Sequence, residues 1–197
     1  MITRLAKSTA CFFVENKIIA AKDEPVYSYG MELLLSTVFN FILALTISLF
    51  TRTFVPCLIN LAAFLTIRIN AGGYHADTHL GCMATLAAVL LIFIAVEKSI
   101  PVSFMMICSP VMIMLSDIIL FVLSPVEHPN KPLNNKKKKQ LKRKAIVWSV
   151  IWTLFGLIFL FVNTKICFYS TSGMFTIAFA MIAEKIKLGQ YFNEKAK

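Results

Sequence analysis

The residues best suited to chemistry lie in one polar segment, Arg68 to Cys82, between the apolar runs 54–67 and 83–96. The segment contains two of the chain's three histidines and one of its five cysteines. A cysteine becomes an effective nucleophile when a neighbouring imidazole removes its proton, because the thiolate is the attacking species. We therefore predict a Cys82–His75 catalytic pair at a membrane surface. The alternative is a short hydrophilic loop whose histidines face water.

The spacing of this pair limits its geometry. His75 and Cys82 are seven residues apart, which is about 10.5 Å along a straight α-helix, whereas proton transfer needs about 3 Å or a bridging water. The pair therefore requires a bend, which Gly81 could supply, or a fold-back of His75 from the non-helical side. Gly72 and Gly73 disfavour helix by about 1 kcal/mol each relative to alanine. They predict a turn, and their N–H groups could approach a developing oxyanion.

His79 competes with His75 for the role of base. It precedes Cys82 by three residues, the spacing at which side chains on a helix touch, so geometry alone favours His79. The two histidines and Cys82 also make a three-ligand zinc set with an open fourth position. Against zinc, no glutamate neighbours them in the H-E-x-x-H arrangement.

Three segments resemble the accessory gene regulator B (AgrB) family. The first and most specific is Arg68-x-x-Ala71-Gly72-Gly73-x-His75, with Cys82 seven residues after the histidine. The second, Ser124 to Leu133 followed by lysines, is similar to the family's proline-lysine loop. The third, Tyr29 to Glu32, opens the first apolar span. Their order and spacing agree with the family over nearly the whole chain.

The resemblance implies an integral-membrane cysteine endopeptidase of Gram-positive quorum sensing that needs no metal or other cofactor. Its substrate would be an AgrD-like propeptide with an amphipathic N-terminal helix, a short signal region and an acidic C-terminal tail. Cys82 would cut off the tail with His75, the histidine after the two glycines, as base. The product would be cyclised to a thiolactone or a lactone. The family expectation is a homodimer.

Several further residues are candidates for supporting roles. Arg68 lies at a membrane edge, where it either clamps a substrate carboxylate or extends its charge to the interface. Asp117 falls within an apolar span, where a carboxylate is costly and predicts a cavity or a partner. The lysine run is a topology anchor that could also recruit an acidic tail. The predicted substrate-binding or transition-state residues are Arg68, Gly72, Gly73, Asp117, Glu32, Lys131, Lys136 and Lys137.

Composition indicates a polytopic membrane protein in one domain, residues 1–197. Hydrophobic residues make up 58% of the 197, and the mean hydropathy is +0.74, far above a soluble domain. The net charge is +10, but the basic residues flank apolar runs, which favours lipid headgroups over nucleic acid. The five cysteines are odd in number and lie mostly in or beside apolar runs, so they do not indicate a disulfide framework.

Helices must position these residues, and the sequence predicts an all-α fold. Residues 1–22 are too charged for a secretory signal. Their apolar pairs recur every seven residues, which predicts an amphipathic helix lying in the headgroup layer or packed on the protein itself. Six apolar segments are predicted spans: 31–50, 54–67, 83–96, 100–123, 145–162 and 166–183.

The second and third of these runs have only 14 residues, short for about 30 Å of hydrocarbon. Either the bilayer is thinned there, or residues 68–71 and 80–82 extend the two helices into a wet cytoplasmic pocket. The segment 124–144 is predicted as a proline-lysine cytoplasmic loop.

Basic residues predict the orientation in the cell membrane. With both termini in the cytoplasm, only Arg52, Lys98 and Lys165 lie outside, and the other 17 of the 20 lysines and arginines lie inside. This satisfies the positive-inside tendency and places the Arg68–Cys82 segment at the cytoplasmic face. Asn40 and Asn60 are interior-facing polar candidates, and we predict that they form interhelical hydrogen bonds. Two rival functions remain, a small peptide transporter using Asp117, Asn40 and Asn60, and a non-catalytic membrane scaffold.

Overall fold

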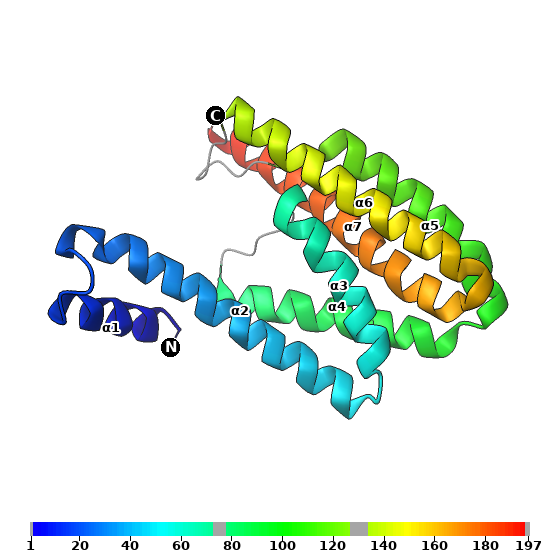
Figure 1. Cartoon of the computed structure of the whole chain (residues 1–197), viewed down its shortest axis with the longest axis horizontal. Helices are drawn as coiled ribbons and strands as arrows, with labels where there is room; N and C mark the ends of the chain where they lie inside the picture. The colour runs from blue at the N-terminus through cyan, green and yellow to red at the C-terminus, as the bar shows by residue number, and fades with distance from the viewer. Residues whose placement is uncertain (1, 73–77, 127–133, 196–197) are drawn as a thin grey trace. The chain divides into compact units, whose positions relative to one another are not determined.

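The structure, a computed structural model, describes residues 2–72, 78–126 and 134–195 (Figure 1). These residues form helices and contain no strand, so the all-α prediction is confirmed. The elements are α1 (Ile2–Glu15), η1 (Ala21–Asp23), α2 (Glu24–Phe50), α3 (Phe54–Ala71), α4 (His79–Ser99), α5 (Val102–Leu123), α6 (Asn135–Val162) and α7 (Thr164–Lys195).

Helices α2 to α7 are each long and apolar enough to cross a membrane, which matches the six predicted spans. The two short apolar runs are lengthened at their polar ends, as one of the two alternatives expects. Helix α3 continues through Arg68 to Ala71 and has 18 residues, and α4 begins at His79 and has 21. At 1.5 Å per residue, α3 is about 27 Å long, close to the hydrocarbon thickness.

The described chain divides into two compact units. The first consists of residues 1–52 and 76–91, and the second of residues 53–75 and 92–197. The prediction of a single integral-membrane peptidase domain stays a prediction.

In the first unit, α1 packs against α2. Ala6 and Ala10 are buried on α1, whereas Leu5 and Phe12 remain about half exposed. The small residues therefore pack on protein, which confirms one of the two alternatives. The exposed apolar side chains suit a headgroup layer, and that placement stays a prediction. The helix ends at Glu15, seven residues before the predicted end, and the pair Ile19-Ala20 lies outside it.

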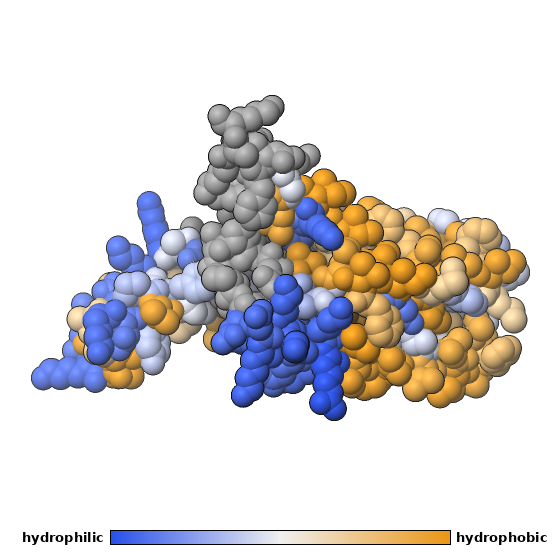
Figure 2. Space-filling model, turned by 90° about the horizontal axis from the view of Figure 1, so that it is seen from above, coloured by the Kyte–Doolittle hydropathy of each residue, from blue (hydrophilic) through white to orange (hydrophobic). Residues whose placement is uncertain are grey.

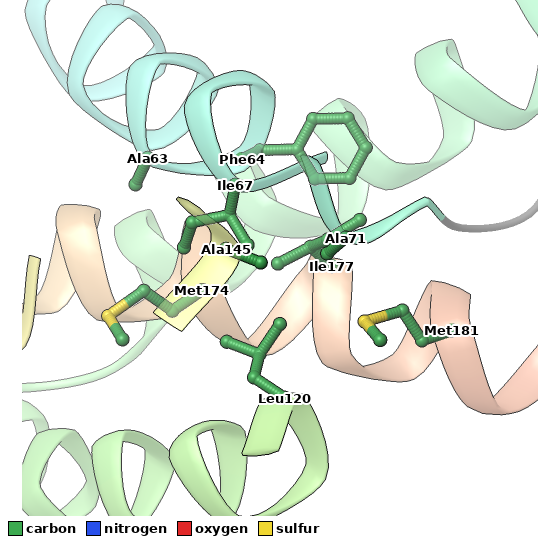
Figure 3. Packing of buried hydrophobic residues seen from close by; sticks show 9 residues of the cluster. All are labelled: Ala63, Phe64, Ile67, Ala71, Leu120, Ala145, Met174, Ile177 and Met181. Carbon is green, nitrogen blue, oxygen red and sulfur yellow. The ribbon is translucent and has the colours of Figure 1, made fainter. Parts of the chain in front are cut away.

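In the second unit, α7 packs against α3, α5 and α6. Figure 3 shows the core, in which side chains from all four helices point toward one another. Small residues let α3 and α7 approach closely, because a Cβ on Gly173 would lie 2.3 Å from the Asn60 carbonyl oxygen. The Asn60 side chain donates to Ser172 Oγ over 2.8 Å, so the predicted interhelical hydrogen bond of Asn60 is confirmed. The cluster residues are Ala63, Phe64, Ile67, Ala71, Leu120, Ala145, Met174, Ile177 and Met181.

The lysine run is helical rather than part of a loop. Helix α6 begins at Asn135, so the predicted loop 124–144 is too long by ten residues at its C-terminal end. Lysine and arginine are good helix formers, and the apolar segment that follows continues the same helix.

Candidate active site

Cys82 lies in the fourth position of α4, just inside its N-terminus. Thr78 caps this helix, because its hydroxyl accepts from the Gly81 N–H at 3.0 Å and its carbonyl accepts from the Cys82 N–H at 3.0 Å. The positive end of a helix dipole favours an anion in such a position. The Cys82 side chain is partly exposed, so the sulfur is accessible and sits where negative charge is stabilised.

A second helix contacts the same sulfur. Asn40, on α2, donates its carboxamide N–H to Cys82 Sγ over 3.5 Å, and both residues belong to the first unit. The predicted interhelical hydrogen bond of Asn40 is therefore confirmed, and its partner is the candidate nucleophile.

Gly81 does not provide the bend that the Cys82–His75 pair requires. It belongs to the first turn of α4, which runs unbroken from His79 to Ser99. The helix begins after His75, so a helical separation of two turns does not apply to the pair. The other alternative, a fold-back of His75 from the glycine side, stays a prediction. His75, Gly73 and Lys131 lie outside the described residues, as does the side chain of His79, so the choice of base stays a prediction.

A backbone hydrogen bond joins two of the three segments that carry the family resemblance. The Val126 N–H donates to the Ala71 carbonyl oxygen over 2.9 Å, which joins the end of α3 to the start of the proline-lysine loop. Gly72 has a φ of 79°, and a Cβ there would lie 2.7 Å from the Val126 oxygen. The predicted turn at Gly72 is confirmed, and it requires glycine for both conformation and space.

Arg68 lies in the last turn of α3, where a cation complements the helix dipole. Its guanidinium carbon lies 5.3 Å from the centre of the Phe64 ring, a cation–π contact. The side chain is partly buried. Its role as a clamp for a substrate carboxylate stays a prediction.

Asp117 bonds to its neighbours within the second unit. Its carboxylate accepts hydrogen bonds from Ser149 and Thr153, the latter over 2.8 Å, which ties α5 to α6. Trp152 on the same stretch of α6 donates to Thr66 over 2.8 Å. The predicted partner of the membrane carboxylate is thus a pair of hydroxyls, and this supports a structural use of Asp117.

Glu32 accepts a hydrogen bond from Thr3 Oγ1 over 2.8 Å, which links α2 to α1. Glu24 lies nearby on the same helix and accepts from the Cys11 thiol over 3.4 Å. Sequence reasoning missed Glu24, because a carboxylate just before the first apolar span carries no signal of a partner. It also missed Glu184, a carboxylate of α7 that is only 2% exposed, because it follows the predicted end of the last span.

Lys136 and Lys137 are exposed in the first turn of α6. Five further basic residues follow within the next seven positions, and no acidic residue lies in the first turn. Figure 2 shows that the visible surface of the second unit is largely apolar, with hydrophilic side chains gathered at the end where α6 begins. Cations at a helix N-terminus oppose the dipole, so this cluster favours an anionic partner.

The remaining cysteines are free thiols, as the sequence predicts. Cys57 and Cys167 are buried, and Cys11 and Cys108 are partly exposed. Among the described side chains, no group of three histidines, cysteines or carboxylates could hold a metal ion. Two of the three zinc ligands considered from sequence lie outside that set.

Comparison with known proteins identifies the family. The model of the accessory gene regulator B family matches residues 6–185, which includes every site segment described above. The chain belongs to the accessory gene regulator B family. No solved structure matches it.

Individual AgrB relatives are distant. The accessory gene regulator protein B of Staphylococcus intermedius is 31% identical over 124 residues, which cover 62% of this chain and 64% of that protein. A protein of Listeria welshimeri named as AgrB-like is 27% identical over 175 residues, 87% of this chain and 85% of its own. A Listeria monocytogenes protein with the same designation is 30% identical over 149 residues, 73% of this chain and 71% of its own.

Proposed function

We propose that this protein is a membrane cysteine endopeptidase that removes the acidic C-terminal tail of an AgrD-like propeptide and cyclises the remainder. Membership of the AgrB family supports a part in accessory gene regulator peptide processing. The observation that carries the catalytic proposal is the position of Cys82, a partly exposed thiol at the capped N-terminus of α4 with an amide donor on its sulfur.

In the first step, the Cys82 thiolate attacks the carbonyl carbon of the peptide bond that precedes the tail. His75 takes the thiol proton and then delivers it to the departing amine. A C–N bond breaks and a C–S bond forms, so the propeptide is held on Cys82 as a thioester. The N–H groups of Gly72 and Gly73 are candidates to stabilise the oxyanion.

In the second step, a cysteine or serine of the propeptide attacks this thioester. Its sulfur or oxygen bonds to the acyl carbon while its proton passes to His75, which is neutral again after protonating the amine, and the C–S bond to Cys82 breaks to release the thiolate. Exchange between two thioesters is nearly balanced in bond energy, so the ring closes without ATP. A water-poor groove that holds both ends of the peptide would favour this capture over hydrolysis.

The basic N-terminus of α6 supports a site for the acidic tail. Lys136 and Lys137 project from its exposed first turn, and Lys131 belongs to the preceding segment. Arg68 and Glu32 are proposed to hold the propeptide near the cut bond, and Asp117 to support that region from within the bundle. We further propose a homodimer in the cell membrane, with the active site and both termini on the cytoplasmic side.

The test uses the full chain in liposomes with its cognate propeptide. We expect Cys82→Ala to abolish release of the tail, while Cys108→Ala, another partly exposed cysteine, retains it. Mass spectrometry of rapidly quenched wild-type enzyme should find the acyl group on the peptide containing Cys82. Tail release by Cys82→Ala at the wild-type rate would exclude the mechanism.

The same assay tests the base. His75→Ala should lose tail release, whereas His79→Ala should keep most of it. The reverse result would assign the base to His79.

A further inference from the structure

The amide of Asn40 is the group that the structure places on the candidate nucleophile. Its Nδ2 lies 3.5 Å from Cys82 Sγ and acts as the donor. The other end of the carboxamide, Oδ1, is buried and has no hydrogen-bond partner among the residues described. Buried acceptors normally find a partner, and one that does not calls for an explanation, of which a catalytic role is one.

We propose that Asn40 is a third catalytic residue, which stabilises the Cys82 thiolate by hydrogen bonding and fixes the direction of its sulfur. The proposal rests on the proposed function, since it names a residue for the same reaction. Asn40 differs from His75 in its role, because a carboxamide neither accepts nor releases a proton at ordinary pH.

The proposed reaction makes the Cys82 sulfur anionic twice. It is an anion before it attacks the peptide carbonyl, and again when the ring-forming thiol or hydroxyl of the propeptide expels it from the thioester. A thiolate that is better stabilised is both more populated as a nucleophile and faster as a leaving group. One N–H donor on α2 therefore serves both steps.

An uncharged donor suits the surroundings of this sulfur. Helix α2 and residues 80–99 of α4 are both candidate spans, so Asn40 and Cys82 each lie within an apolar segment long enough to cross a membrane. A lysine or arginine on α2 would have to be kept charged at that depth, which is costly. An amide supplies its N–H without that cost, and the dipole of α4 adds to its effect.

The free acceptor points to contact with the substrate. Oδ1 can accept a hydrogen bond from a backbone N–H of the propeptide or from its ring-forming thiol or hydroxyl. Such a contact would place the incoming group beside the sulfur that it must replace, with the amide bridging the two.

The alternative is that Asn40 only joins α2 to α4. The two roles differ in what they do to the sulfur. If Asn40 only holds α2 against α4, another side chain that packs between the helices would leave the reactivity of Cys82 unchanged. If Asn40 donates to the sulfur, its loss would change the stability of the thiolate directly. Asn40→Leu separates them, because leucine has a similar volume and no donor.

The experiment measures alkylation by iodoacetamide at each cysteine of the full chain in detergent, resolved by peptide mass spectrometry. We expect Asn40→Leu to slow alkylation of Cys82 roughly tenfold, the equivalent of one hydrogen bond to a charged group. Cys108 in the same molecules serves as the internal control and should react at the wild-type rate. Asn40→Gln, which restores an amide, should return the Cys82 rate to within about threefold of wild type.

A Cys82 rate that is unchanged in Asn40→Leu would overturn the proposal. So would an equal loss in Asn40→Gln and Asn40→Leu with unaltered thermal unfolding, because a donor would then not be the property that matters. If Asn40→Leu does not fold, the Cys82 alkylation rate of Asn40→Gln is the test, and a rate well outside about threefold of wild type would overturn the proposal. Alkylation needs no substrate, so these outcomes are independent of whether Cys82→Ala still releases the tail, which tests the proposed function.

A second readout follows the two chemical steps. With propeptide present, Asn40→Leu should lower kcat more than it raises KM, and the acyl group should accumulate on Cys82 because the leaving group is poorer. A rise in KM alone would assign Asn40 to binding and overturn its role on the sulfur.

Discussion

At Gly72 the chain leaves α3 in a conformation that side chains rarely adopt. Its φ of 79° and the 2.7 Å approach of the Val126 oxygen to a Cβ exclude any larger residue without movement of the backbone. The hydrogen bond from Val126 to Ala71 lies next to it. The direction in which the chain departs toward His75 is therefore fixed by one glycine.

We predict that Gly72→Ala lowers tail release at least tenfold, because strain of this kind costs about 1–3 kcal/mol and would displace the segment that carries His75, the proposed base. Release of tail from the propeptide by purified variants measures it. Gly189→Ala is the matched control, since a Cβ there meets no atom within 4 Å. Equal activity of the two variants would show that the Gly72 turn does not position the site.

Cys11 offers a contrast to Cys82. The hydrogen bond to Glu24 raises the pKa of the Cys11 thiol above its usual value. Less thiolate is then present near neutral pH, and the thiolate is the form that reacts.

Glu24→Gln should accordingly bring the pKa of Cys11 back toward normal and speed its alkylation a few-fold at pH 8. The comparison is made at the peptide level, with Cys108 as the reference thiol. A slower reaction of Cys11 in this variant would contradict the assignment of Glu24 as the cause.

At the scale of helices, the crossing of α3 and α7 sets the core of the second unit. Three glycines differ in the room they leave for a methyl group. A Cβ on Gly173 would lie 2.3 Å from a backbone oxygen of α3, one on Gly156 would lie 3.2 Å from the movable end of Ile113, and one on Gly189 meets nothing.

Alanine at these positions should destabilise in that order. Gly173→Ala should cost about 2–3 kcal/mol, since overpacking against rigid backbone separates the helices. Gly156→Ala should cost less, and Gly189→Ala should be neutral or slightly stabilising because alanine favours helix. Thermal unfolding in detergent ranks them, and a stable Gly173→Ala would mean that α3 and α7 do not touch as described.

The first turn of α6 combines two effects of opposite sign. Its lysines oppose the helix dipole, which costs about 0.3–1 kcal/mol for each exposed charge, and they attract anions. Replacement of Lys136 and Lys137 by glutamine should therefore stabilise α6 slightly while weakening binding.

We predict that this double variant binds a synthetic acidic tail peptide several-fold more weakly, and that the affinity depends less on salt than in wild type. Fluorescence anisotropy at two ionic strengths measures both. Arg52→Gln, which removes one positive charge from the turn after α2, controls for the effect of net charge. Unchanged affinity and salt dependence would remove the lysines from the tail site.

At the scale of the whole chain, the distribution of charge predicts its orientation. Lys98 should lie outside and Lys136 inside, so Lys98→Cys should react with a membrane-impermeant maleimide in intact cells, whereas Lys136→Cys should react only after the membrane is opened. Labelling of Lys136→Cys in intact cells would reverse the topology and place Cys82 on the wrong side for a cytoplasmic propeptide.

The helices of this molecule could be predicted from sequence because uninterrupted apolar runs leave the backbone no other way to satisfy its polar groups in lipid. The residues at which these helices begin and end could not be predicted in this way. Helix α1 stops at Glu15, α3 and α4 extend into the polar segment, and the lysine run is helical. Local features that hydropathy does not report lie at these ends: the turn at Gly72 follows α3, Thr78 caps α4, and lysine is a good helix former at the start of α6.

The candidate nucleophile was predicted from residue type and family resemblance, but its surroundings were not. Asn40 was singled out as an interior polar residue, and nothing in the sequence paired it with Cys82, 42 positions away. A supporting role of Asp117 in catalysis stays a prediction, and nothing in the sequence identified Ser149 and Thr153 as its hydrogen-bond partners. Such pairings depend on how helices are rotated, which periodicity leaves undetermined when a helix is apolar all round.

Helix α6 has 28 residues, about 42 Å at 1.5 Å each, while the hydrocarbon layer is only about 30 Å thick. Roughly its first eight residues therefore extend out of the lipid as a rigid helical segment, and these residues carry most of the positive charge. With a flexible loop, the height of a bound tail above the bilayer would vary, whereas a rigid helix would keep that height constant. A propeptide anchored in the membrane at its other end would then be held between two sites at a fixed separation. The bond that is cut would be selected by the length of peptide between those sites as well as by side chains.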